Sequence, residues 1–381
     1  NSIRFIKEDR NGLLWLITER DIFNFNKEKE AFARFPLDPS AWQDGYKAMV
    51  FEKDWFLEDR AGRIWVGTNA GLYRYDGRSW TRIFPADRDF DKGGCYKVNC
   101  VREDDEGNIW IATEAFGLLK ISDGKKGSYE VIRILPDNVK PPEKLIVTSV
   151  LPESKNKLWI FYNSTLIDFN PVTGESKSYL FSDQPFVHGW GNLLRIDKMF
   201  RNKDGSLWLI YIGAGFVLRF DPAKENLRYY QVPRWVEFDC IRDNTENFWF
   251  ASVAQTIFRL VTDTLPFMTK LIPNSDFVHV GEKQRICQDE NGDLWLALSG
   301  GVFKIRNPDM SPELKLEKIE LPDNKGEPGS VMYDKKGNLW FGLSKGIIFK
   351  YDPSGKSFRR FDLPQGSFPD NDNFITLIAE D

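Results

Sequence analysis

One short pattern recurs eight times along the 381 residues and constrains the fold more than any other feature. Each copy ends in a tryptophan, and successive tryptophans stand 41 to 50 residues apart. An acidic residue or asparagine stands six positions before each tryptophan: Asp9, Asp59, Asp104, Glu153, Asn202, Asp243, Asp289 and Asp334. The tryptophans are Trp15, Trp65, Trp110, Trp159, Trp208, Trp249, Trp295 and Trp340. Self-similarity at a nearly fixed period predicts stacked units that share one continuous core.

The second copy shows what one unit contains. Residues 53–59, 64–68, 71–76 and 79–84 alternate or run apolar as strands do, and Gly62 suits a tight turn between the first two. Four antiparallel strands in roughly 45 residues make one propeller blade. The sequence therefore predicts an all-β fold, a β-propeller of four-stranded antiparallel blades. Eight blades are favoured, and seven blades with a stray repeat are the alternative.

The repeats divide the chain without leaving room for a separate domain, so residues 1–381 are predicted to form a single β-propeller domain. The predicted repeats lie near residues 3–36, 53–84, 98–135, 147–181, 196–232, 237–272, 283–321 and 328–363. Residues 374–381 resemble residues 3–9 and open a further repeat. We therefore expect the chain to be an excised piece of a longer protein.

The repeated residues are predicted to be structural. One tryptophan at the same place in each unit is expected to pack between blades, and the acid before each turn is expected to cap the turn's backbone N–H groups. A net charge of −4 without a basic run argues against nucleic-acid binding, and no apolar run reaches the roughly 18 residues of a membrane span.

The full motif resembles a known family. Val101 to Thr113 followed by Gly117 and Leu118 is similar to the two-component regulator propeller repeat, as are residues 56–76. The fourth and sixth copies depart from it, with Asn156 and Glu246 in place of the turn glycine. The resemblance implies a periplasmic sensor domain of a hybrid two-component histidine kinase of the Bacteroidetes type, which binds an oligosaccharide and signals to genes for glycan use. A further propeller, an immunoglobulin-like domain, a membrane span and the kinase would then follow outside this chain.

The predicted ligand site lies in the loops that join one blade to the next, because these loops gather at one end of a propeller axis and carry residues outside the repeat. Aromatic rings and polar groups together suit a sugar. The predicted ligand-binding residues are Trp42, Tyr46, Arg88, Tyr96, Trp190 and Trp235. Glu19, Arg20, Asn69, Glu114, Asn163 and Lys345, in the shorter turns between second and third strands, are expected to rim the same end.

No catalytic residue, metal site or cofactor is predicted. The two histidines, His188 and His279, belong to no recognised catalytic motif, and the Asp87–Asp91 loop lacks the glycine and glutamate of a calcium loop. The expected partner is a small-molecule or oligosaccharide ligand, with no nucleic acid, contact with a membrane only through a segment outside this chain, and a homodimer as an open alternative. Two other functions stay open: a propeller lyase or glycosidase acting on polysaccharide, and a protein-interaction scaffold.

Overall fold

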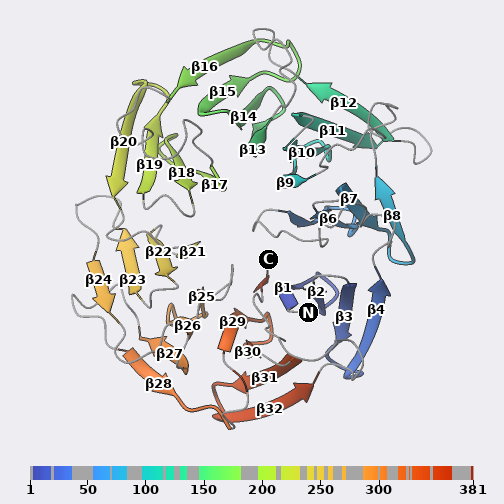
Figure 1. Ribbon diagram of the computed structural model, residues 1–381, viewed down its shortest axis with the longest axis vertical. Coiled ribbons are helices and arrows are strands. Elements are labelled where there is room, and N and C mark those ends of the chain that lie inside the picture. The colour runs from blue at the N-terminus through green and yellow to red at the C-terminus, as the bar shows by residue number, and fades with distance from the viewer. Residues whose placement is uncertain are drawn as a thin grey trace, which may run out of the picture. The chain divides into compact units, whose positions relative to one another are not determined.

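The computed structural model describes most of the repeats and part of the segments between them. The described residues are 3–18, 21–36, 55–68, 71–83, 97–114, 117–123, 129–134, 146–181, 196–211, 216–231, 238–243, 247–252, 256–260, 268–271, 286–298, 301–306, 316–322, 326, 328–343, 346–362 and 379–380. All regular elements in these ranges are strands (Figure 1). The described part of the chain holds no helix with the length and apolarity that a membrane crossing requires.

The chain divides into two compact units. Residues 1–39 and 232–381 form the first unit, and residues 40–231 form the second. The strands of the first unit are β1 (Ile3–Glu8), β2 (Leu13–Thr18), β3 (Asp21–Asn26), β4 (Ala31–Pro36), β21 (Phe238–Arg242), β22 (Phe248–Ser252), β23 (Thr256–Leu260), β24 (Met268–Leu271), β25 (Ile286–Gln288), β26 (Leu294–Leu298), β27 (Gly301–Ile305), β28 (Leu316–Ile319), β29 (Pro328–Tyr333), β30 (Leu339–Leu343), β31 (Ile347–Asp352), β32 (Ser357–Asp362) and β33 (Ala379–Glu380).

The second unit has the same number of sheets. Its strands are β5 (Phe56–Glu58), β6 (Ile64–Thr68), β7 (Gly71–Tyr75), β8 (Trp80–Ile83), β9 (Val98–Glu103), β10 (Ile109–Thr113), β11 (Leu118–Asp123), β12 (Tyr129–Ile134), β13 (Val147–Ser154), β14 (Lys157–Tyr162), β15 (Thr165–Phe169), β16 (Ser176–Leu180), β17 (Lys198–Arg201), β18 (Leu207–Tyr211), β19 (Phe216–Asp221) and β20 (Asn226–Gln231).

Each repeat forms one antiparallel sheet in which four consecutive strands pair in order, as β5-β6-β7-β8 does. Within each unit the first strands of successive sheets lie next to one another, as β9, β13 and β17 do. The fold is therefore a β-propeller with eight blades, as predicted, and the seven-bladed alternative is wrong. We call the end where each first strand begins the entry end, and the end with the turns between strands one and two the turn end.

Within each unit, repeated tryptophans pack against the next blade, as predicted. Trp110 on β10 lies in a buried cluster with Val150 and Leu158 of the next blade, and Trp340 on β30 packs against Leu14 and Phe25 of the first blade. All eight side chains are at most 1% exposed. Burying a large aromatic ring at these joints gives the blades of each unit a shared apolar core.

The acid six residues before the tryptophan organises the turn between the first two strands. Asp9 Oδ1 accepts hydrogen bonds from the backbone N–H groups of Asn11 and Leu13, at 2.8 and 3.0 Å. Its Oδ2 accepts one from the Trp15 indole N–H at 2.8 Å. Six further copies have the same acid-to-indole hydrogen bond, and the fifth copy has Asn202 in place of the acid. The predicted capping of the turn is confirmed, and the indole bond is an addition to it.

A cation on the third strand covers many of these tryptophans. In six blades, the third-strand residue that pairs with the second-strand tryptophan is a cation. Its charged group lies 4.5 to 6.0 Å from the centre of the indole ring. These residues are Arg74, Lys120, Arg219, Arg259, Lys304 and Lys350. Except for Trp208, whose copy has Asn202 in place of the acid, each of these indoles has a carboxylate at its N–H and a cation at its face. Cation–π contacts contribute roughly 0.5–2 kcal/mol each, more where water is excluded.

One glycine marks a close approach between blades. A Cβ at Gly67, on β6, would lie 2.5 Å from Val98 Cγ1 on β9 of the next blade. Ala112 holds the equivalent place on β10 and Gly342 on β30, so glycine is not required at this position in every blade.

The end of the chain joins the first blade. β33 pairs in parallel with β1, so the first sheet has five strands in the order β33-β1-β2-β3-β4. Lys7 pairs with Ala379, and Glu8 with Glu380.

Candidate functional site

The predicted ligand-binding residues lie outside the part of the chain that the structure describes. This holds for Trp42, Tyr46, Arg88, Tyr96, Trp190 and Trp235, and for both histidines. Of the turn residues predicted to rim the same end, the structure describes Glu114 and Asn163. In the second unit, the structure describes the strands and turns from which the blade-joining loops extend. They run from the start of β9 to the start of β17.

Two short contacts fix the entry end of the third blade. The Glu114 N–H donates to the Lys97 carbonyl at 3.0 Å, and the Lys97 ammonium lies 3.4 Å from the Glu114 carboxylate. The Lys97 side chain is 13% exposed and the Glu114 side chain 34% exposed. The turn between β10 and β11 is thereby tied to the residue before β9, which is where the loop from the second blade arrives.

Polar side chains on the first strands join one blade to the next at this end. Asn99 on β9 donates from Nδ2 to the Val147 carbonyl at 2.8 Å, and Thr148 Oγ1 accepts from the Ile196 N–H at 3.3 Å. Asn99 and Ser149 are each 1% exposed, and Asn99 Oδ1 and Ser149 Oγ make no hydrogen bond with any described residue. Leaving a buried polar atom unpaired costs roughly 1–3 kcal/mol.

The fourth blade closes its second and third strands with a two-residue turn. Asn163 and Ser164 both have positive φ, 43° and 62°, as a type I′ hairpin turn requires. Neither is glycine, so this turn is rigid and stores strain. Beside it, burial raises the pKa of the Tyr162 phenol against a lowering hydrogen bond with Asn163. A phenol held protonated donates hydrogen bonds well and is a poor base at neutral pH.

Tyr162 was not among the residues predicted from sequence. The signal was available, since an aromatic residue ends the second strand immediately before a turn at the entry end. The entry end of the second unit thus offers an ammonium–carboxylate pair, an amide, hydroxyls and a phenol. Within the described residues this set includes no histidine.

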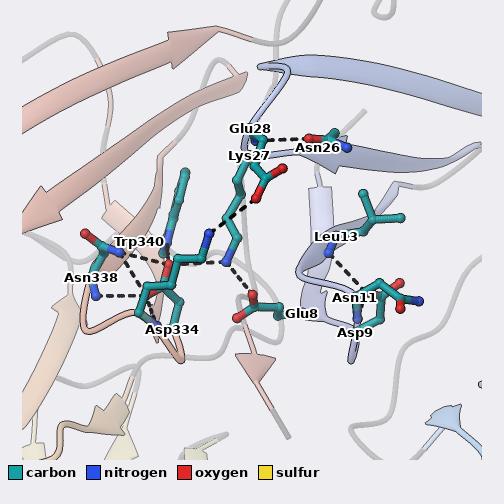
Figure 2. Close-up of polar contacts among 11 residues, drawn as sticks. Glu8, Asp9, Asn11, Leu13, Asn26, Lys27, Glu28, Asp334, Asn338 and Trp340 are labelled. Carbon is teal, nitrogen blue, oxygen red and sulfur yellow. Dashed lines mark hydrogen bonds and ion pairs between the residues drawn. The ribbon is translucent and has the colours of Figure 1, made fainter.

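The turn end of the first unit carries a second polar cluster, between the last blade and the first (Figure 2). Lys27, from the turn after β3, forms ion pairs with Glu8 on β1 and, at 3.3 Å, with Asp334 after β29. The three side chains are 8%, 3% and 1% exposed, respectively. Asp334 also accepts from the Trp340 indole and the Asn338 amide, so the cluster belongs to the framework of the blades.

Burial on its own would raise the pKa of Asp334, but the Trp340 N–H, the Asn338 N–H and Lys27 outweigh it and lower that pKa below its ordinary value. The carboxylate is therefore ionised at neutral pH. Among the described residues no group of three or more histidine, cysteine, aspartate or glutamate side chains is arranged to hold a metal ion.

The family comparison bears on the third repeat, which supplies β9 and β10 of the entry end. A model described as two component regulator propeller matches residues 93–115. Residues 93–115 are thus similar to the two-component regulator propeller repeat. The matched residues include two contacts described above. Asp104 accepts the hydrogen bond from the Trp110 indole at 2.8 Å, and the Glu114 N–H donates to the Lys97 carbonyl at the entry end. A search of curated proteins found no match.

Solved structures similar to this chain include lyases and an extracellular domain of a putative hybrid two component system. A streptogramin B lyase is 17% identical over 83% of this chain and 94% of its own, with a TM-score of 0.54. An inactive virginiamycin B lyase from Staphylococcus aureus with quinupristin is 14% identical over 78% and 94%, with a TM-score of 0.50. The extracellular domain of a putative hybrid two component system from B. thetaiotaomicron is 17% identical over 97% and 67%, with a TM-score of 0.32. At such identities the lyases support the propeller fold alone.

Proposed function

We propose that this propeller is the ligand-sensing domain of a two-component signalling protein, that it works outside the cytoplasm, and that it is not itself catalytic. The observation that carries the proposal is the regulator propeller repeat at residues 93–115, since that family takes its description from two-component regulators. The signal would pass to a histidine kinase encoded outside these residues, and the location would be periplasmic.

The proposed ligand is an oligosaccharide bound at the entry end. The rigid turn at Asn163 and the ion pair between Lys97 and Glu114 hold the entry end of the second unit in place. The Asn99 amide also joins the first strands of the third and fourth blades at this end, by its hydrogen bond to the Val147 carbonyl. A fixed framework of this kind favours recognition by the loops that it carries, because binding then costs little ordering.

The contact residues proposed on those loops are Trp42, Tyr46, Arg88, Tyr96, Trp190 and Trp235. Stacking a sugar on an indole ring and burying it contributes on the order of 1–3 kcal/mol. Replacing Trp190 by alanine should therefore weaken binding roughly 5- to 150-fold, at tenfold per 1.4 kcal/mol. A Trp42→Ala and Trp190→Ala double variant should lose more than either single variant.

The test is calorimetric titration of a panel of oligosaccharides into the parent and the variants, with mass spectrometry of the incubated sugars. The matched control is Trp80→Ala, because Trp80 lies on the fourth strand β8 and stacks on Tyr75 of its own blade. Binding that depends on Trp190 and not on Trp80, without sugar cleavage, supports the sensor. Cleavage products would favour a lyase or glycosidase, and a folded double variant that binds as tightly as the parent would refute the site.

A further inference from the structure

The fifth blade carries an open polar cleft at its turn end, away from the entry end of the same blade. The cleft has a volume of about 190 Å³. Its lining residues are Asp204, Arg219, Asp221, Lys224, Asn226 and Arg228. They come from β19, β20 and the two turns of this sheet, so one repeat builds the whole cleft (Figure 1).

Two arginines face each other across this cleft. Arg219 on β19 and Arg228 on β20 are directly opposite partners in the antiparallel pairing, so both side chains stand on the same face of the sheet. Side chains at such positions begin roughly 4.5–5.5 Å apart, and like charges there destabilise the pair. The blade therefore keeps two guanidinium groups together at a cost that something must offset.

The carboxylates of the cleft are already engaged. Asp204 accepts from Arg219 Nη2 and from the Ser206 hydroxyl, at 2.5 and 2.7 Å. Asp221 lies 3.1 Å from the Lys224 ammonium and caps the backbone N–H groups of Ala223 and Lys224. Each carboxylate thus neutralises one cation. Arg228 forms no ion pair with any described residue, which leaves one positive charge in the cleft.

The same position has an acidic partner on the fourth, seventh and eighth blades. On the fourth blade, Lys177 faces Asp168 and pairs with Glu225 of the fifth blade at 2.5 Å. On the seventh, Glu317 faces Lys304. On the eighth blade, Arg359 faces Lys350, and the Arg359 guanidinium pairs with Glu30 of the first blade at 2.5 Å.

We propose that this cleft binds an oxyanion group, a carboxylate or a sulfate, on a small ligand. An oxyanion placed between Arg219 and Arg228 would relieve their repulsion and supply the missing negative charge. The planar guanidinium of Arg228 matches the two oxygens of such a group, and the Asn226 amide adds a donor beside it. An uncharged sugar has no negative charge to place between the two arginines. The ligand of this cleft therefore differs in chemistry from the neutral oligosaccharide proposed at the entry end, and the inference does not depend on that site.

The test uses the whole chain labelled with ¹⁵N-arginine and follows the side-chain Nε–Hε signals by NMR. Sodium sulfate, galacturonate and the uncharged galactose are titrated separately, with ionic strength held constant by sodium chloride. We expect saturable shifts of the Arg219 and Arg228 signals with sulfate, galacturonate or both, and none with galactose. The two anions distinguish a sulfate ligand from a carboxylate ligand.

Two variants decide the outcome. Arg228→Gln should weaken the binding seen at Arg219 roughly tenfold or more, because hydrogen bonds to a charged group are lost. Arg360→Gln removes the same charge from β32, where Arg360 pairs with Asp362, and should change nothing at the cleft. Shifts that never saturate, or an Arg228→Gln variant that binds as the parent does, would overturn the proposal. Circular dichroism checks that both variants are folded.

Discussion

Replacing Lys27 by methionine should destabilise the first unit more than any surface change of the same kind. Methionine keeps most of the side-chain volume and removes the charge. Glu8 and Asp334 would then remain buried and negatively charged with no ammonium between them, and Glu8 Oε2 has no hydrogen bond to any described residue. Desolvated charge that has lost its partner is the expensive outcome of breaking a buried ion pair.

The magnitude follows from what each carboxylate keeps. Asp334 retains the Trp340 indole and the Asn338 amide as donors, so most of the cost falls on Glu8. Removing one partner of a buried pair costs about 3–5 kcal/mol, and we expect the lower end, about 3 kcal/mol. Adding Glu8→Gln in the same chain removes the stranded charge, so the double variant should return to within about 1 kcal/mol of the parent.

Urea denaturation followed by far-ultraviolet circular dichroism measures these differences. Lys336→Met is the matched control, because Lys336 is 64% exposed and lies 3.6 Å from an exposed Glu28. Its midpoint should stay with the parent, as exposed ion pairs contribute little. Two outcomes would contradict the ion-pair cluster. One is a Lys27→Met variant as stable as the control. The other is a double variant whose loss of stability equals the sum of the losses of Lys27→Met and Glu8→Gln.

The same variant has a pH signature. The pKa of Asp334 is lowered in the folded state, partly by Lys27, so its stabilising contribution is present above the unfolded pKa of about 3.9 and is lost as the pH falls through the folded value. The difference in the free energy of unfolding between the parent and Lys27→Met should therefore have its full value at pH 7 and decrease below about pH 4. A difference that is constant from pH 7 to pH 3 would contradict this assignment.

Two further predictions concern packing. Trp110→Ala should cost about 3–5 kcal/mol in urea denaturation, as large-to-small aromatic changes in a core do, whereas Trp42→Ala, outside the repeat template, should cost far less; the reverse order would refute the division into core and loop. Gly67→Ala should cost about 1–3 kcal/mol because its Cβ meets Val98 at 2.5 Å, and Val98→Ala in the same chain should recover part of the loss. Additive losses in that pair would rule out the proposed clash.

The blades were predictable because their determinants repeat. The second strand of the second copy was predicted to the residue, at 64–68, since its ends are set by a turn glycine and an apolar run. Strand starts were less exact: β5 begins at Phe56 rather than residue 53, and β8 begins at Trp80 rather than residue 79. The strand β33 also differs from expectation, because residues 379–380 pair with β1 and extend an existing sheet.

The entry end was predictable only in part, because its contacts join residues of different repeats. Glu114 was selected as a rim residue, but its ion pair with Lys97 and the link from Asn99 to Val147 arise from blade packing. The cleft on the fifth blade could be found only through register, since Arg219 and Arg228 are nine residues apart and nothing in the local sequence places them opposite each other.

The alternation of carboxylate, indole and cation in nearly every blade has a consequence for spectroscopy. A carboxylate at the indole N–H and a cation over the ring both act on the excited-state dipole, and both recur around buried rings such as Trp65, Trp110 and Trp295. These tryptophans should emit as one nearly uniform, blue-shifted population that responds little to added ligand. A change in emission on adding a sugar would then come from tryptophans outside the repeated positions. Intrinsic fluorescence of the unlabelled protein could therefore measure ligand binding at the loops.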